Sequence, residues 1–261
     1  MKPRAACVVL MLAAALASCD RPVPAPSGQQ LPVVTQKPPA ETPRIPPKSP
    51  WPFLDASAGA PTDAAFDPAA VIKRNYYFVL DASGSMRDQK CSGTARKIDV
   101  AKRALMQFAL HIPADANVGG LVFDEQGVHS LIPIGPLDPV RLRRAIASVS
   151  AGGSTPLAQA IREAYSALTQ RAMSQLGYGE YHLIVVTDGE ATGEDPRGVV
   201  NRLIAESPVV LHTIGFCIGD KHSLNQPGQT IYHAADSPGQ LEQGLQDVLA
   251  EAPTFNVARF K

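Results

Sequence analysis

The chain has 261 residues, with 24 Lys and Arg residues against 24 Asp and Glu residues, so its formal net charge at pH 7 is zero. This balance excludes a generally basic surface of the kind that binds nucleic acid through its phosphates. Hydrophobic residues make up 45% of the chain, which excludes disorder throughout, but 13 of the 24 prolines fall between residues 20 and 70. We therefore expect one folded domain preceded by a non-globular lead.

Residues 1–18 are predicted to be a secretory signal, because a short basic start is followed by a small apolar run over 5–17. That run is too short to span a bilayer as a helix. It ends in Leu16-Ala17-Ser18-Cys19, which resembles the lipobox of bacterial lipoproteins and implies that Cys19 carries the lipid. The alternative is an ordinary signal in which Cys19 is incidental. We expect a lipid-anchored protein of the bacterial cell envelope, facing the periplasm.

Residues 19–72 are predicted to be a Pro-rich, disordered tether. Runs such as 45–52 (IPPKSPWP) lack the backbone donors that a sheet or helix needs, and they favour extended conformations. About 50 such residues could hold a domain on the order of 150 Å from the membrane. A docking role for the Pro-rich motifs is the alternative interpretation.

Residues 73–253 alternate strand and helix signals, and residues 254–261 are predicted to be a C-terminal tail. Two continuous apolar runs, 76–80 and 181–187, have the length of buried strands and end at Asp81 and Asp188. The other expected elements are a helix over 98–109, a hairpin of 118–123 and 128–134 around a four-residue loop, and strands over 209–216 and 230–234.

Four helix starts share a capping residue followed by proline, at Asp138-Pro139, Thr155-Pro156, Asp195-Pro196 and Ser237-Pro238. Strands that alternate with such helices predict an α/β fold with a doubly wound, Rossmann-like, mostly parallel sheet. The hairpin adds one antiparallel edge strand. Ligands of such sheets bind at the carboxyl ends of the strands, where Asp81 and Asp188 lie.

Three separated segments supply the side chains of a predicted metal site. They are 81–86 (DASGSM) after the first strand, 152–156 (GGSTP) before a helix, and 187–190 (TDGE) after a later strand. Together they offer two carboxylates and three hydroxyls, which suit a hard cation: Mg²⁺ first, with Mn²⁺ or Ca²⁺ as alternatives. Taken singly, each residue has a plainer role, such as capping a turn or a helix.

The set Asp81-x-Ser83-x-Ser85, then Thr155, then Asp188, resembles the complete metal-ion-dependent adhesion site of von Willebrand factor A domains. The resemblance implies a Rossmann-like fold with a divalent cation at its upper face. It further implies that Ser83 and Ser85 coordinate the cation directly and that Thr155 does so directly or through water. Asp81 and Asp188 would act largely through bound waters and hydrogen bonds.

Neutral hydroxyl ligands leave a cation only partly neutralised, so we expect a protein partner to complete the site with an Asp or Glu carboxylate. The predicted function is a non-enzymatic interaction module held to the membrane by its lipid, with no nucleic-acid partner. One alternative is a structural envelope scaffold with a vestigial metal site. Another is a metal-dependent or serine hydrolase, although the flanks of Ser83 and Ser85 do not match a Gly-x-Ser-x-Gly nucleophile turn.

Two further features are placed near the same face. Cys91 follows the first strand and Cys217 follows the strand over 209–216, and an exported compartment permits a disulfide between them. Two free, unrelated thiols are the alternative. The long polar loop 219–228 is a candidate specificity loop, with a passive connection as the other interpretation.

Overall fold

The computed structural model describes residues 51–52 and 71–250. The predicted signal, the predicted lipid attachment residue Cys19, nearly all of the predicted tether and the predicted C-terminal tail lie outside these residues. The elements in chain order are β1 (Arg74–Asp81), η1 (Gly84–Arg87), α2 (Lys97–His111), β2 (Asn117–Asp124), β3 (Gly127–Pro136), α3 (Pro139–Ser148), α4 (Leu157–Ser174), β4 (Glu180–Thr187), α5 (Arg197–Glu206), β5 (Val210–Phe216), β6 (Ile231–Ala235) and α6 (Pro238–Ala250).

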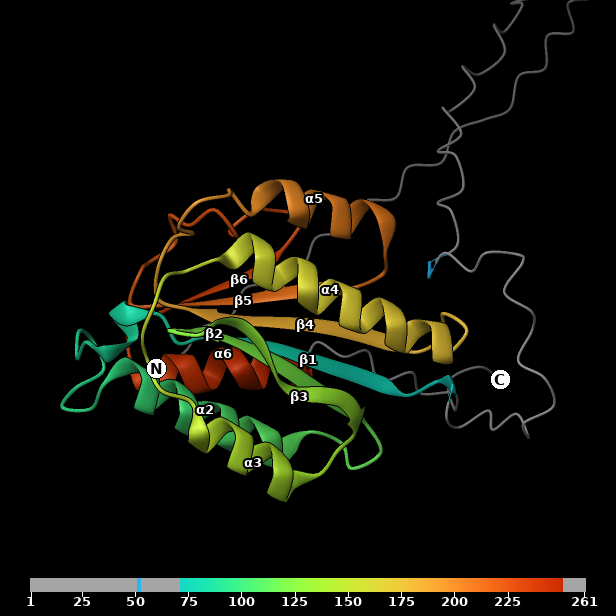
Figure 1. Ribbon diagram of the computed structural model, residues 1–261, viewed down its shortest axis with the longest axis horizontal. Coiled ribbons are helices and arrows are strands. Elements are labelled where there is room, and N and C mark those ends of the chain that lie inside the picture. The colour runs from blue at the N-terminus through green and yellow to red at the C-terminus, as the bar shows by residue number, and fades with distance from the viewer. Residues whose placement is uncertain (1–50, 53–70, 251–261) are drawn as a thin grey trace, which may run out of the picture. The chain divides into compact units, whose positions relative to one another are not determined.

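The strands form one six-stranded sheet in the order β3-β2-β1-β4-β5-β6. Every neighbouring pair is parallel except β2 and β3, so the predicted fold class is confirmed, including its single antiparallel edge strand. Figure 1 shows three layers, with α2, α3 and α6 on one face of the sheet and α4 and α5 on the other. This is the doubly wound arrangement expected when strands alternate with helices.

Strand β1 lies in the middle of the sheet and is buried on both faces. Tyr76, Phe78 and Leu80 pack into the core beneath α2, α3 and α6, whereas Tyr77 and Val79 pack beneath α4 and α5. Alternation of side chains along a strand explains why this run is apolar throughout. Within residues 71–250, none of the helices has both the length and the apolar character that a membrane span requires.

The helix starts agree with the sequence pattern at α3 and α6 but lie one residue later at α4 and α5. Asp138 caps α3 as expected, since its carboxylate accepts hydrogen bonds from the amides of Val140 and Arg141. In α4 the N-cap is Pro156, so Thr155 lies outside the helix. The amide of Thr155 donates to the hydroxyl of Thr192 at 2.9 Å.

The hairpin loop is also shorter than the four residues that the sequence suggested. Asp124 pairs with Gly127, which leaves two residues in the turn. A carboxylate oxygen of Asp124 accepts the amide hydrogen of Gln126 at 2.8 Å, and Gly127 adopts a φ of +88°. These are the local bonding and the glycine conformation that a tight turn requires.

Trp51 and Pro52, from the segment expected to be tether, lie against the domain. Only 8% of Trp51 is exposed, and its ring meets Tyr181 edge-on with centroids 4.8 Å apart. The ring also stacks beside Tyr165 of α4 at 6.4 Å. Tyr181 is at the amino end of β4, so this contact lies at the opposite end of the strand from Asp188.

Candidate functional site

The predicted site lies where the order of the strands changes direction. From β1 the chain passes through α2 to β2 on one side, while β4, the other neighbour of β1, is reached through α4 on the opposite face (Figure 1). Loops that leave neighbouring strands toward opposite faces open a crevice at the carboxyl ends. Leu80 pairs with Val186, so Asp81 and Thr187 end their strands side by side.

Asp81 is fully buried and held through both carboxylate oxygens. The amide of Ser83 donates to Oδ1 at 2.8 Å, and the hydroxyl of Thr187 donates to Oδ2 at 2.6 Å. Burial raises the pKa of Asp81 to about 6, although these hydrogen bonds act in the opposite direction. The two hydrogen bonds thus fix the orientation of the Asp81 carboxylate, while burial makes its charged form less favourable.

Backbone hydrogen bonds hold the second segment against the first. The amide of Gly152 donates to the carbonyl of Ala82 at 2.7 Å, and the amide of Gly84 donates to the carbonyl of Gly153 at 3.0 Å. Gly153 has a φ of +78°, and a Cβ at this position would overlap the backbone of Asp124. A side chain there would force the segment away from the end of β2.

The hydroxyls of Ser83 and Ser85 lie 3.1 Å apart, and Ser85 donates to Oδ1 of Asp188 at 2.6 Å. Neighbouring ligands around an octahedral Mg²⁺ are separated by about 3.0 Å when each lies about 2.1 Å from the ion. The spacing of the two serine oxygens therefore fits a shared hard cation. Across the described residues, no three His, Cys, Asp or Glu side chains form a metal-holding group, and this set contains only two carboxylates.

Thr155 joins the site from the second segment. It is 6% exposed, and its backbone exchanges two hydrogen bonds with Thr192, which follows the third segment. The first segment thus contacts both of the others, through Ala82 with Gly152 and through Ser85 with Asp188, while Thr155 bonds to Thr192 just after the third segment. The structure brings the five predicted residues to one end of β1 and β4.

The sequence interpretation missed Lys97, the first residue of α2. Its ammonium lies 2.8 Å from Oδ2 of Asp188, and the two side chains are 5% and 0% exposed. The only signal available was a lysine at the start of the helix that follows the Asp81 segment. Whether such a side chain turns inward depends on how α2 packs, which the sequence pattern does not show.

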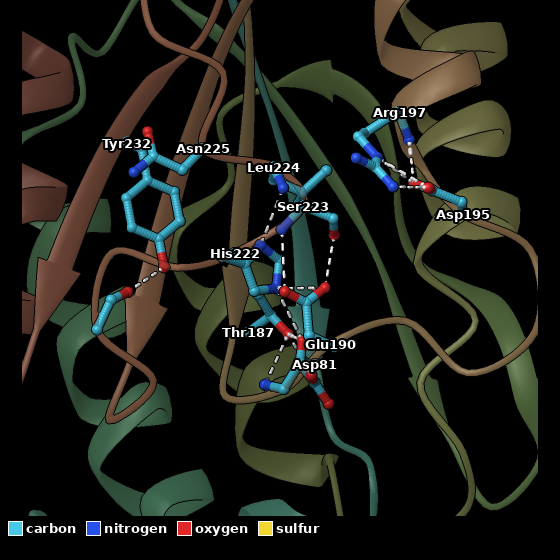
Figure 2. A network of polar contacts seen from close by, with 12 residues as sticks. Asp81, Thr187, Glu190, Asp195, Arg197, His222, Ser223, Leu224, Asn225 and Tyr232 are labelled. Atoms are coloured by element: carbon cyan, nitrogen blue, oxygen red, sulfur yellow. Dashed lines mark hydrogen bonds and ion pairs between the residues drawn. The ribbon is translucent and has the colours of Figure 1, made fainter.

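The long loop 217–230 is tied to the third segment by a second group of contacts, shown in Figure 2. Glu190 accepts hydrogen bonds from the amide and hydroxyl of Ser223 at 3.0 and 2.6 Å. Nδ1 of His222 accepts from the amide of Leu224, so Nε2 carries the proton and donates to the carbonyl of Gly189 at 3.0 Å. Movement of this loop is thereby linked to the residues beside Asp188.

Cys91 and Cys217 form a disulfide with their Cα atoms 6.0 Å apart. They lie in the turn after η1 and in the residue after β5, both at the carboxyl end of the sheet. The bond spans 126 residues of sequence and ties the loops on the α2 side of the site to the start of loop 217–230.

A surface hollow of about 500 Å³ adjoins the third segment, with Glu190, Arg197 and Lys221 in its wall. A larger hollow of about 680 Å³ lies between α4 and α5, where Tyr165 and Val199 line it. Neither of these two hollows is lined by any of the five predicted site residues. Of the two, only the smaller is lined by a residue of the third segment, Glu190.

The model of the von Willebrand factor type A domain matches residues 75–248, well over half of the chain. The chain belongs to this family. A relative is the uncharacterized protein YwmD of Bacillus subtilis, which is 27% identical over 215 residues, covering 74% of this chain and 92% of that protein.

Two solved structures illustrate how widely this von Willebrand factor A fold is used. BatB from Bacteroides thetaiotaomicron superposes with a TM-score of 0.54 at 18% identity, covering 68% of this chain and 99% of BatB. The pilus adhesin SpaC from Lactobacillus rhamnosus GG gives 0.52 at 15% identity, covering 68% of this chain and 30% of SpaC. At these identities the likeness establishes the fold alone.

Proposed function

We propose that this chain is an envelope-bound interaction module that binds an acidic group of a protein partner through a divalent cation at Asp81, Ser83, Ser85, Thr155 and Asp188. The observation that carries the proposal is the contact of three distant chain segments, which turns two serine hydroxyls toward one another beside Asp188. The family membership agrees with it, since the domain type also occurs in a pilus adhesin.

The chemistry of the donors favours binding of a carboxylate. Mg²⁺ at such a site would supply an electrophilic centre for an incoming oxygen, with Mn²⁺ or Ca²⁺ as substitutes. Ser83, Ser85 and Thr155 would hold it through neutral oxygens. Asp81 and Asp188 orient the hydroxyls and water, because Asp81 is fixed by Thr187 and Asp188 accepts the hydroxyl hydrogen of Ser85. A partner's carboxylate then supplies charge that the hydroxyls do not.

We propose that the module is not an enzyme. The hydroxyl of Ser85 donates to Asp188, and the nearby histidine of the loop, His222, donates to the carbonyl of Gly189. A nucleophilic serine is activated by an adjacent base that is free to take its proton, whereas Asp188, which contacts Ser85, is already paired with the ammonium of Lys97 at 2.8 Å. Hydrolytic turnover that Ser83→Ala abolishes would contradict this part of the proposal.

We further propose that the domain is anchored to the bacterial envelope by a lipid on Cys19 and faces the periplasm. The support is the sequence Leu16-Ala17-Ser18-Cys19 at the end of an apolar run. Growth with an alkyne-bearing fatty acid should label the wild-type chain and leave Cys19→Ala unlabelled. Equal labelling of both chains, or of neither, would contradict the anchor.

The experiment that tests the interaction is crosslinked recovery of partners from solubilised envelopes, with Mg²⁺, with EDTA, and with EDTA followed by excess Mg²⁺. We expect recovery in the first and third conditions and at least a tenfold loss in the second. Ser83→Ala should lose the partner in all three conditions. Ser174→Ala is the matched control, since Ser174 is an exposed residue at the end of α4 that bonds only its own helix turn.

A purely structural scaffold gives a different pattern in this experiment. Chelation and Ser83→Ala would then leave partner recovery unchanged, and the proposal would be wrong.

A further inference from the structure

Lys97 places a positive charge inside the candidate metal site. Its ammonium lies 2.8 Å from Oδ2 of Asp188, while Oδ1 of the same carboxylate accepts the hydroxyl hydrogen of Ser85. One carboxylate therefore separates the ammonium from the serine hydroxyls. Because the Lys97 side chain is 5% exposed, water screens this charge poorly and its effect on the site is large.

The backbone holds Lys97 in this position. The amide of Lys97 donates to the carbonyl of Asp88 at 2.8 Å, and the next residue, Ile98, is buried in the core. The neighbouring basic residue behaves differently. Arg96 is largely exposed and its guanidinium pairs with Asp99 at 2.8 Å, so it turns away from the site.

The charges of these buried groups define how a cation and a carboxylate would affect each other. Asp81, Asp188 and Lys97 together carry one negative charge, so a divalent cation leaves an excess of one positive charge. A partner's carboxylate then brings the site to neutrality. With a neutral residue at position 97, the cation alone would achieve neutrality and the carboxylate would bring an excess negative charge.

We propose that Lys97 couples the two binding events: it weakens cation binding when no carboxylate is present and strengthens the binding of a carboxylate once the cation is bound. This inference rests on the proposed function. Coupling between two ligands is reciprocal, so a carboxylate must raise the affinity for the cation by the same factor. The domain would then bind the cation and the partner tightly when both are present, and would bind each of them weakly alone.

The experiment titrates Mn²⁺ into the purified protein by calorimetry, with and without acetate as the carboxylate probe. The variants are Lys97→Met, Lys97→Gln and, as the matched control, Arg96→Met, which removes the adjacent but outward-facing charge. We expect both Lys97 variants to bind Mn²⁺ about tenfold more tightly than wild type without acetate. Acetate should tighten Mn²⁺ binding in wild type and Arg96→Met, and clearly less in the Lys97 variants.

Removing one partner of a buried ion pair can destabilise a fold, and Lys97→Gln retains a hydrogen-bond donor for Asp188 for this reason. Circular dichroism establishes that each variant is folded before titration. Folded Lys97 variants with unchanged or weaker Mn²⁺ affinity, or with the wild-type response to acetate, would overturn the inference and leave the proposed function standing.

Failure of the proposed function looks different. If neither wild type nor the Lys97 variants bind Mn²⁺, the metal site itself is refuted. If only the Lys97 variants bind it, Lys97 takes the place of the cation in this protein, and both the coupling and the proposed function are wrong.

Discussion

The hydroxyl of Thr187 donates a 2.6 Å hydrogen bond to Asp81 and so joins the carboxyl ends of the two central strands, β1 and β4. Thr187→Val keeps the shape of the side chain and removes the donor, which leaves Oδ2 of Asp81 without this partner. Replacing a residue that orients the ligands of a metal typically lowers the affinity for that metal by about 10- to 100-fold. We expect Mn²⁺ affinity to fall by about tenfold in calorimetry. Thr187→Ser, which retains a hydroxyl, should stay near wild type, and equal affinities for all three chains would contradict the role.

The disulfide between Cys91 and Cys217 should contribute strongly to stability, because it closes a long segment of chain in the unfolded state. Chain entropy predicts about 3–5 kcal/mol for a loop of this length. We expect the free energy of unfolding of Cys91→Ser/Cys217→Ser, measured in urea, to be lower by this amount. Counting thiols in the denatured wild-type protein provides the control. Free thiols at both Cys91 and Cys217, located by alkylation and mass spectrometry, or an unchanged unfolding midpoint in the double variant, would contradict the prediction.

A buried pair of histidines should make the domain sensitive to acid. Nδ1 of His182 lies 3.3 Å from Nε2 of His212 on neighbouring strands. Burial lowers the pKa of His182, and burial together with the charges of His182 and His233 takes that of His212 to about 3. Glu180, 3.7 Å from His182, acts in the opposite direction on His182.

The number of protons bound by the folded and unfolded chains decides whether stability rises or falls with pH. Below pH 6.5 the unfolded chain binds protons that the folded chain excludes, so stability is complete above that pH and is lost as pH falls toward 3. For His212 the loss reaches about 2 kcal/mol at pH 5. Urea unfolding in EDTA should show a shallower pH dependence in His212→Gln than in wild type. Parallel curves for the two proteins between pH 7 and 5 would contradict it.

Trp51 should contribute to stability although it precedes the domain. Its ring packs against Tyr165 and Tyr181, and removal of a buried tryptophan side chain costs several kcal/mol. We expect Trp51→Ala to lower the free energy of unfolding by about 2–4 kcal/mol. Tyr178→Ala is the control, since Tyr178 is 61% exposed near the same end of the sheet and should change stability little. Equal effects of the two substitutions would show that the Trp51 contact adds nothing.

The fold could be predicted from the sequence because its signals are local. Buried strands such as Tyr76–Leu80 are continuously apolar, and Asp138 marks a helix start through bonds to its own next residues. The gathering of Asp81 and Asp188 followed from the rule that parallel strands end at the same edge. These patterns need no knowledge of tertiary packing.

The remaining features depend on contacts between distant residues. Thr155 resembled a helix cap, but the helix begins one residue later, with Pro156 as its N-cap, and Thr155 bonds instead to Thr192, 37 residues away. Lys97 is buried only because α2 packs at the site, and the contact of His222 with Gly189 joins residues 33 apart. Trp51 lies in a proline-rich run whose composition favours an extended tether, and the contacts with Tyr165 and Tyr181 are not encoded in that run.

The most direct test of the central claim is anomalous diffraction from crystals of the domain grown with Mn²⁺. We predict one strong anomalous peak in contact with the hydroxyls of Ser83 and Ser85, and its loss in crystals of Ser83→Ala. Well-ordered crystals with these hydroxyls bonded only to each other and to Asp188, and no anomalous peak between them, would contradict the metal-dependent account.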